Sequence, residues 1–166
     1  MKVCKILFYF FLSIATAINA LIIVESCIGG SNSAAQSLSV SEAIANLIEE
    51  IAPKATIDHN ALHSAVRKIV GHFLLFGLSG TFTCLTFVMN DYMMNRFKWK
   101  NIIFILSIGL VIALVSELIQ YFTPGRYGAL TDVLIDYSGY IFFSGIVYLI
   151  YTLISLQKAK KTENCI

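Results

Sequence analysis

Residues 102–122 read IIFILSIGLVIALVSELIQYF, a run in which Glu117 is the only charged residue. A helix rises about 1.5 Å per residue, so about 20 such residues cross the roughly 30 Å hydrocarbon core of a bilayer. Three further runs of 19 to 21 residues contain no Asp, Glu, Lys or Arg: Ile6–Val24, Ile69–Met89 and Tyr137–Leu156. The chain is therefore predicted to be an all-α integral membrane protein, a bundle of four transmembrane helices.

The composition excludes a soluble domain. Of the 166 residues, 57% are hydrophobic and 13% are charged, and the mean hydropathy is +0.76. A soluble domain of this size usually carries about 25% charged residues. We expect one membrane domain over residues 1–166, with spans at about 6–24, 66–89, 102–122 and 131–156 and an external segment at 25–65.

The distribution of charge predicts the orientation, because cytoplasmic loops are rich in Lys and Arg. If both termini are cytoplasmic, that side carries only two acids, Asp91 and Glu163, and the other side carries the remaining eight. A multi-pass protein of a bacterial plasma membrane is expected, with lipid headgroups rather than nucleic acid as the partner of the basic tail. The cytoplasmic cations would be Lys2, Lys5, Arg96, Lys98, Lys100, Lys158, Lys160 and Lys161.

The external segment contains a predicted amphipathic helix. Gly29–Ser33 has the composition of a flexible loop, Ser39 and Glu42 form a capping-box pattern, and Pro53 ends the apolar run. Such a helix either lies on the outer membrane surface or packs on the bundle as a lid. Its apolar residues at helical spacing are Ile44, Leu47, Ile48 and Ile51. Asp58 is expected to cap the next helix, which runs through Arg67 into the second span.

Polar residues of three spans are predicted to meet in one layer near the outer face. His72 lies five residues beyond Arg67, or roughly 7–8 Å deeper in a helix. Glu117 lies at a similar depth below the outer end of its run, and Asp132 and Asp136 open the fourth span. Ionisable groups at membrane depth are costly and usually mark a functional cavity or pathway.

The spacing of these residues predicts which faces they share. Residues three or four apart lie on one face of an α-helix. Three polar pairs have this spacing: Lys68 with His72, Glu117 with Gln120, and Asp132 with Asp136. Gly139 continues the Asp132/Asp136 face and would let a neighbouring helix approach closely. We expect a pocket, open to the outside, lined by acids, cations and one imidazole.

Four residues are candidates for binding an anionic ligand. Arg67 and Lys68 fit a phosphate or carboxylate headgroup, and they also fit interfacial side chains that reach to the membrane surface. Arg126, held by the turn Pro124-Gly125, fits ligand binding or a structural salt bridge. Gln120 completes the ligand-binding set. Three cations facing three acids would also suit a self-compensated network that holds helices together.

Four residues are candidates for catalysis: His72, Glu117, Asp132 and Asp136. His72 suits an acid–base role because the pKa of histidine is close to neutral pH. It also suits a metal ligand beside a carboxylate. Because this spacing is not specific for metal, no metal or other cofactor is expected.

Three motifs together carry a resemblance to a known family: Arg67-Lys68-x-x-x-His72, then Ser116-Glu117-x-x-Gln120-x-x-x-Pro124-Gly125-Arg126, then Asp132-x-x-x-Asp136-x-x-Gly139. In this order and over nearly the whole chain, they resemble the VanZ-like membrane protein family. The resemblance implies a cell-envelope role in bacteria, including resistance to the glycopeptide teicoplanin. Asp136 departs from the family pattern, in which Asn is more usual, and so adds an acid to the site.

Three functions are compatible with such a pocket. The first is binding of an anionic lipid-linked cell-wall precursor or a glycopeptide-type ligand, without chemistry. The second is an intramembrane enzyme in which His72 and a carboxylate move protons at a cell-wall or lipid headgroup. The third, a transporter subunit, fits less well because the polar layer does not continue to the cytoplasmic side.

Overall fold

The computed structural model describes residues 2–52, 57–94 and 100–163, and every regular element in these residues is a helix. The elements are α1 (Lys2–Cys27), α2 (Gly30–Ile51), α3 (His59–Val66), the π-helical segment η1 (Arg67–Leu74), α4 (Leu75–Met94), α5 (Lys100–Phe122) and α6 (Leu130–Glu163). Pro53, Arg96 and Lys98, which carried sequence predictions, lie outside the described residues.

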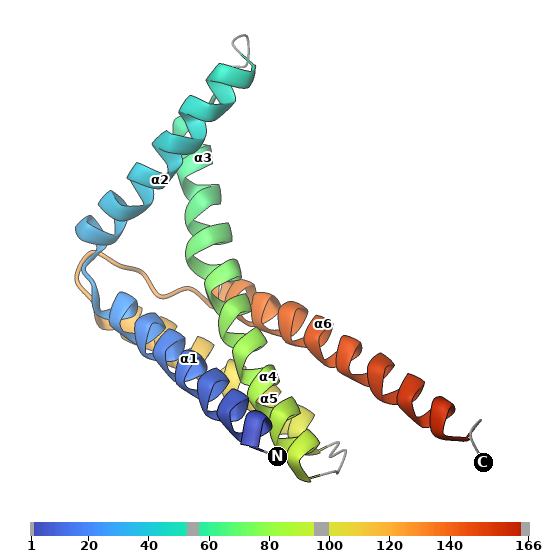
Figure 1. The fold of residues 1–166 in the computed structure, drawn as a ribbon. Coiled ribbons are helices and arrows are strands. Elements are labelled where there is room, and N and C mark those ends of the chain that lie inside the picture. Colours follow the sequence, from blue (N-terminus) through green and yellow to red (C-terminus); the bar gives the residue numbers. More distant parts are fainter. Residues whose placement is uncertain (1, 53–56, 95–99, 164–166) are drawn as a thin grey trace.

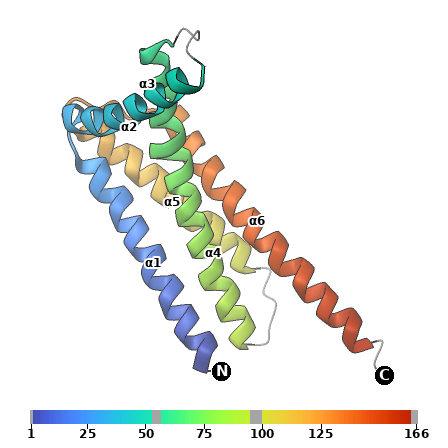
Figure 2. The ribbon, with the colours of Figure 1, turned by 45° about the horizontal axis from the view of Figure 1, so that its top comes forward.

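Four helical stretches are long and apolar enough to cross a membrane: Lys2–Cys27, His59–Met94, Lys100–Phe122 and Leu130–Gln157. They confirm the prediction of an all-α, four-span membrane protein. The second stretch is continuous through α3, η1 and α4 and is longer than the predicted span. Both termini lie at the same end of the bundle, as an even number of spans requires (Figures 1 and 2).

The start of α2 differs from the prediction. The helix begins at Gly30, so the expected loop at Gly29–Ser33 is wrong, and Ser39 lies inside the helix rather than at its cap. A tertiary contact explains the difference. The N–H of Gly30 donates to the carbonyl of Pro124 at 3.1 Å, and a Cβ on Gly30 would overlap the backbone of Gly125. The turn after α5 therefore holds the first residues of α2.

The capping prediction for the next helix is confirmed. The Asp58 carboxylate accepts hydrogen bonds from the backbone N–H groups of Asn60 (3.0 Å) and Ala61 (3.1 Å). Ser37 of α2 lies 2.7 Å from Nε2 of His63 in α3, so the two helices are linked side by side. Figure 1 shows this α2–α3 hairpin extending from one end of the bundle.

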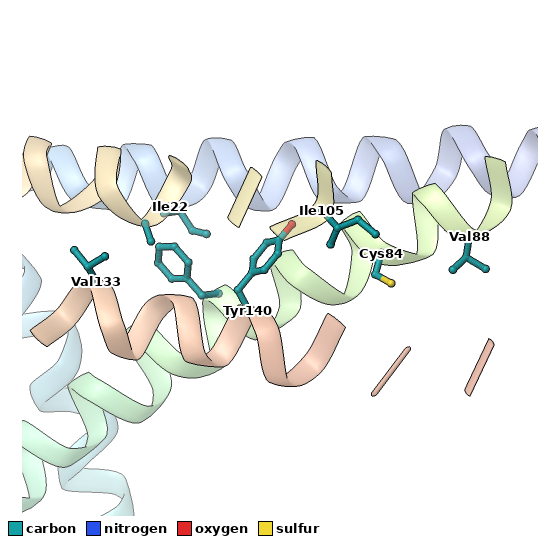
Figure 3. Close-up of a cluster of buried hydrophobic side chains, with 8 residues drawn as sticks. Ile22, Cys84, Val88, Ile105, Val133 and Tyr140 are labelled. Carbon is teal, nitrogen blue, oxygen red and sulfur yellow. The ribbon is translucent and has the colours of Figure 1, made fainter. Parts of the chain in front are cut away.

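The core of the bundle lies where α6 crosses α4 and α5. Tyr140 of α6 is fully buried and projects into the middle of the apolar cluster (Figure 3). Gly80 of α4 faces the Tyr140 backbone and Gly109 of α5 faces its ring, with no room for a Cβ at either position. Small residues allow helices in a membrane to approach this closely. The other members of the cluster are Ile22, Phe76, Cys84, Val88, Ile105, Ala113 and Val133.

Candidate functional site

The π-helical segment η1 determines which cation faces the site. A π-helix has hydrogen bonds between residues five apart, and such segments are frequent at functional sites. Arg67 and His72 are five apart, and both line the same cavity. Lys68, predicted from α-helical spacing to share the face of His72, is exposed and does not line this cavity. Because the helix changes type here, Arg67 rather than Lys68 faces the cavity.

A close helix crossing brings His72 to Asp136. Gly139 of α6 packs on the backbone of Phe73, and a Cβ at Gly139 would overlap the Phe73 carbonyl. The neighbouring His72 and Asp136 are then close enough for a hydrogen bond, with Nδ1 of His72 2.9 Å from Oδ1 of Asp136. His72 is 6% exposed and Asp136 is 0% exposed. The predicted close approach at Gly139 is thus confirmed, and it builds a buried imidazole–carboxylate pair.

Glu117 joins this pair from α5. It is 4% exposed, and both of its carboxylate oxygens accept hydrogen bonds at 3.0 Å, Oε1 from the Gln120 side chain and Oε2 from the Ala129 backbone. One potential ligand atom each from His72, Glu117 and Asp136 lies within 4.8 Å of the other two. The predicted meeting of polar residues from three spans is therefore confirmed for these three residues.

Arg126 connects the turn after α5 to the junction of α1 and α2. Its guanidinium donates to the carbonyl of Glu25 at 2.8 Å and to the Ser33 hydroxyl at 2.5 Å. Burial, and then the positive charge of Arg67, lower the pKa of Arg126. Its starting value is so high that the side chain stays protonated near neutral pH.

The described residues do not form the ion-pair network that was the alternative interpretation of these charges. Among the described residues, no carboxylate lies within ion-pair distance of Arg67, Lys68 or Arg126. Arg67 also makes no side-chain hydrogen bond to a described residue. Arg67 therefore lines the cavity without a counter-ion from the residues that the structure describes.

A cavity of about 280 Å³ lies against this cluster. Its polar lining includes both arginines, one acid (Glu25), Ser26, His72 and Gln120. Its apolar lining comes mainly from α1, α4 and the segments beside them. Ser33, Ser37 and Val40 of α2 complete the wall, whereas Leu47 and Ile51, on the apolar face predicted to pack as a lid, are exposed. The apolar lining residues are Leu21, Ile22, Val40, Val66, Val70, Leu75 and Phe76.

The structure separates the candidate residues into three groups. His72, Glu117 and Asp136 form the buried cluster, and Arg67, Gln120 and Arg126 line the cavity beside it. Asp132 is half-buried and Lys68 is exposed, and neither belongs to the cluster or to the cavity lining.

Sequence reasoning missed the contribution of α2. Ser33 and Ser37 both line the cavity, and Ser33 accepts a hydrogen bond from Arg126. The two serines are four residues apart, with Val40 three residues further on, which is the spacing of one helix face. Of these three residues, only Ser33 lies in the segment interpreted as a loop.

Comparison with known proteins places the chain in a family. The family model described as VanZ/LLP1 matches residues 6–152, which is most of the chain and includes every residue of the cluster. Neither the curated proteins nor the solved structures gave a match. The architecture is that of a multi-pass membrane protein, with a polar cluster built from η1, α5 and α6. This chain belongs to the VanZ/LLP1 family.

Proposed function

We propose that this VanZ/LLP1 protein binds the anionic headgroup of an envelope amphiphile in the cavity, and that this binding underlies a role in resistance to glycopeptides such as teicoplanin. The observation that carries the proposal is the lining of the cavity. Arg67 and Arg126 lie at its polar part, which also includes Glu25, His72, Gln120 and three serines, while seven apolar side chains line the rest. An amphiphile has the matching distribution, a charged headgroup attached to an apolar chain.

The charges of the two arginines favour an anion. Both line the cavity, and neither has a carboxylate at ion-pair distance among the described residues. After burial, the positive charge of Arg67 is the next cause that lowers the pKa of Arg126, whereas the charges of Glu117 and Glu25 raise it. A phosphate or carboxylate between them would relieve this repulsion and accept hydrogen bonds from both. A lipid-linked cell-wall precursor presents such a group on the outer side of a bacterial plasma membrane, the side to which the sequence assigns the cavity.

The binding proposal is tested with farnesyl phosphate as the probe and farnesol as its neutral counterpart. Titration of the detergent-purified chain is expected to give clear preference for the phosphate. Arg67→Gln removes a charged hydrogen-bond donor worth about 1.5–3 kcal/mol, which is roughly a 10- to 150-fold loss of affinity. Lys68→Gln is the matched control, because Lys68 is adjacent, equally charged and outside the cavity.

Equal binding of farnesol and farnesyl phosphate, or equal losses for the two variants, would contradict the binding proposal. A cellular test compares the same two variants with the wild-type chain. Expression of the wild-type chain in a teicoplanin-sensitive host is expected to raise the inhibitory concentration of teicoplanin. Arg67→Gln should lose that increase, and Lys68→Gln should keep it.

A second candidate function, acid–base chemistry on the bound headgroup, is favoured by the His72–Asp136 pair. The hydrogen bond to Asp136 orients the imidazole at the wall of the cavity, as carboxylates do for catalytic histidines in other enzymes. Binding and chemistry are separated by His72→Ala and Glu117→Gln. Retained binding of farnesyl phosphate with loss of the teicoplanin phenotype supports chemistry, whereas joint loss supports binding alone.

A further inference from the structure

Three potential metal ligands converge in the buried cluster. His72, Glu117 and Asp136 come from three different elements, are each at most 6% exposed, and offer ligand atoms within 4.8 Å of one another. Three ligand atoms at the usual 2.0–2.2 Å from one ion are separated by about 3.3–3.6 Å in tetrahedral geometry. The side chains would therefore need to close by at most about 1.5 Å to share one ion.

An unpartnered oxygen points independently to a ligand at this place. Asp136 is fully buried, and its Oδ2 has no hydrogen-bond partner among the described residues. Buried polar groups are normally satisfied by a partner, and an unsatisfied one requires an explanation. Since Oδ1 already contacts His72, Oδ2 is the atom of Asp136 that is free to bind.

The charge of the cluster also favours a cation. Two buried carboxylates face one imidazole, so with both carboxyls ionised even a protonated His72 leaves a net negative charge inside a transmembrane bundle. Arg67 and Arg126 do not neutralise it, because neither lies at ion-pair distance from Glu117 or Asp136. Burying an unpaired charge is costly, and a divalent cation would remove that cost.

We infer that His72, Glu117 and Asp136 bind one divalent transition-metal ion of the Zn²⁺ or Mn²⁺ class. One imidazole with two carboxylates suits these ions, whereas Ca²⁺ and Mg²⁺ prefer oxygen ligands alone. The hydrogen bonds from Gln120 and from the Ala129 backbone hold the Glu117 carboxylate in place, as partners of metal ligands usually do. This inference is independent of the proposed ligand, and it replaces the expectation of no metal drawn from sequence spacing.

A bound ion changes the chemistry available at the cavity. His72 lines the cavity, so the ion lies beside the space where a headgroup would bind. An ion there adds positive charge to that contributed by the arginines. An imidazole that binds the ion is not free to act as a general acid or base, so metal occupancy also decides whether His72 serves the second candidate function.

The inference is tested by titrating the full-length, chelator-treated chain in lipid nanodiscs with ZnCl₂ or MnCl₂ alone. We expect one ion per chain. Electron paramagnetic resonance of the Mn²⁺ form should show the hyperfine coupling of a coordinated imidazole nitrogen, which is the nitrogen signature. His72→Ala and Asp136→Asn should each lower the affinity by at least about 100-fold, the upper part of the range seen when merely supporting residues are changed. His72→Ala should also abolish the nitrogen signature.

Asp132→Asn is the matched control, because Asp132 lies one turn from Asp136 on α6 and outside the cluster. It should keep wild-type affinity. Failure of the folded wild-type chain to bind either ion stoichiometrically overturns the inference, whatever the variants do. Binding that survives His72→Ala, or Ca²⁺ binding of equal strength, also overturns it. Farnesyl phosphate titration of the chelator-treated chain keeps the two proposals separate, since either can fail alone.

Discussion

Gly139→Ala is predicted to destabilise the protein through a single methyl group. Its Cβ would lie 2.9 Å from the carbonyl carbon of Phe73 and would overlap the Phe73 oxygen. Both are backbone atoms, so no side-chain rotation can relieve the clash, and η1 and α6 must move apart. Overpacking of this kind typically costs about 1–3 kcal/mol. Ala also favours the helix over Gly by about 0.8–1.0 kcal/mol, which offsets part of that cost.

Gly145→Ala is the matched control, because Gly145 lies on the same helix and a Cβ there meets nothing within 4 Å. The helix-propensity gain is common to both variants and cancels in the comparison. Gly139→Ala should therefore be less stable than Gly145→Ala by about 1–3 kcal/mol. Reversible unfolding in mixed detergent micelles measures this difference. Equal free energies of unfolding for the two variants would refute the close crossing of η1 and α6.

Three further predictions address other parts of the structure. Deletion of the exposed Ile69 should remove the extra residue of the π-helical segment and leave Arg67 four residues from His72, on the same face of an α-helix, so that affinity for farnesyl phosphate is kept; a loss of affinity as large as that of Arg67→Gln would contradict this account of η1. Asn19→Ala removes the acceptor of the fully buried Ser79 hydroxyl, a 2.5 Å contact between α1 and α4, and should lower the free energy of unfolding by about 1–3 kcal/mol; an unchanged value would show that the contact is not needed. Arg126→Gln should speed backbone hydrogen exchange at the start of α2, because the α1–α2 junction loses two hydrogen bonds to the guanidinium. Exchange as slow as in the wild type would exclude that linkage.

Local sequence signals predicted the number of membrane-crossing helices and the start of α3. Four uncharged or nearly uncharged runs identified the four membrane-crossing helices, and Asp58 identified the start of α3. These features depend on short-range effects, which are the solvation of side chains by lipid and the hydrogen bonds of one cap to the next turn. Gly139 was also interpreted correctly, because a residue without a side chain in a span usually marks a helix contact.

Local signals failed where a distant contact competes with them. The composition of Gly29–Ser33 is typical of a loop, but the Gly30 contact with Pro124 and Gly125 holds it in a helix. Lys68 has α-helical spacing from His72, but the helix changes type at Arg67. The partner of Gly30 lies more than ninety residues away, so the residues next to Gly30 do not predict it. The residues next to Arg67 do not predict the helix type either.

The sequence by itself determined that the chain is a four-span membrane protein and that polar groups from three spans lie at a similar depth. Hydropathy and the constant rise of a helix are enough for both conclusions. Only the tertiary structure decided that His72, Glu117 and Asp136 meet, that Arg67 rather than Lys68 faces the cavity, and that α2 covers it. Depth follows from counting residues along one helix, whereas contact depends on how each helix is rotated and how closely two backbones pack.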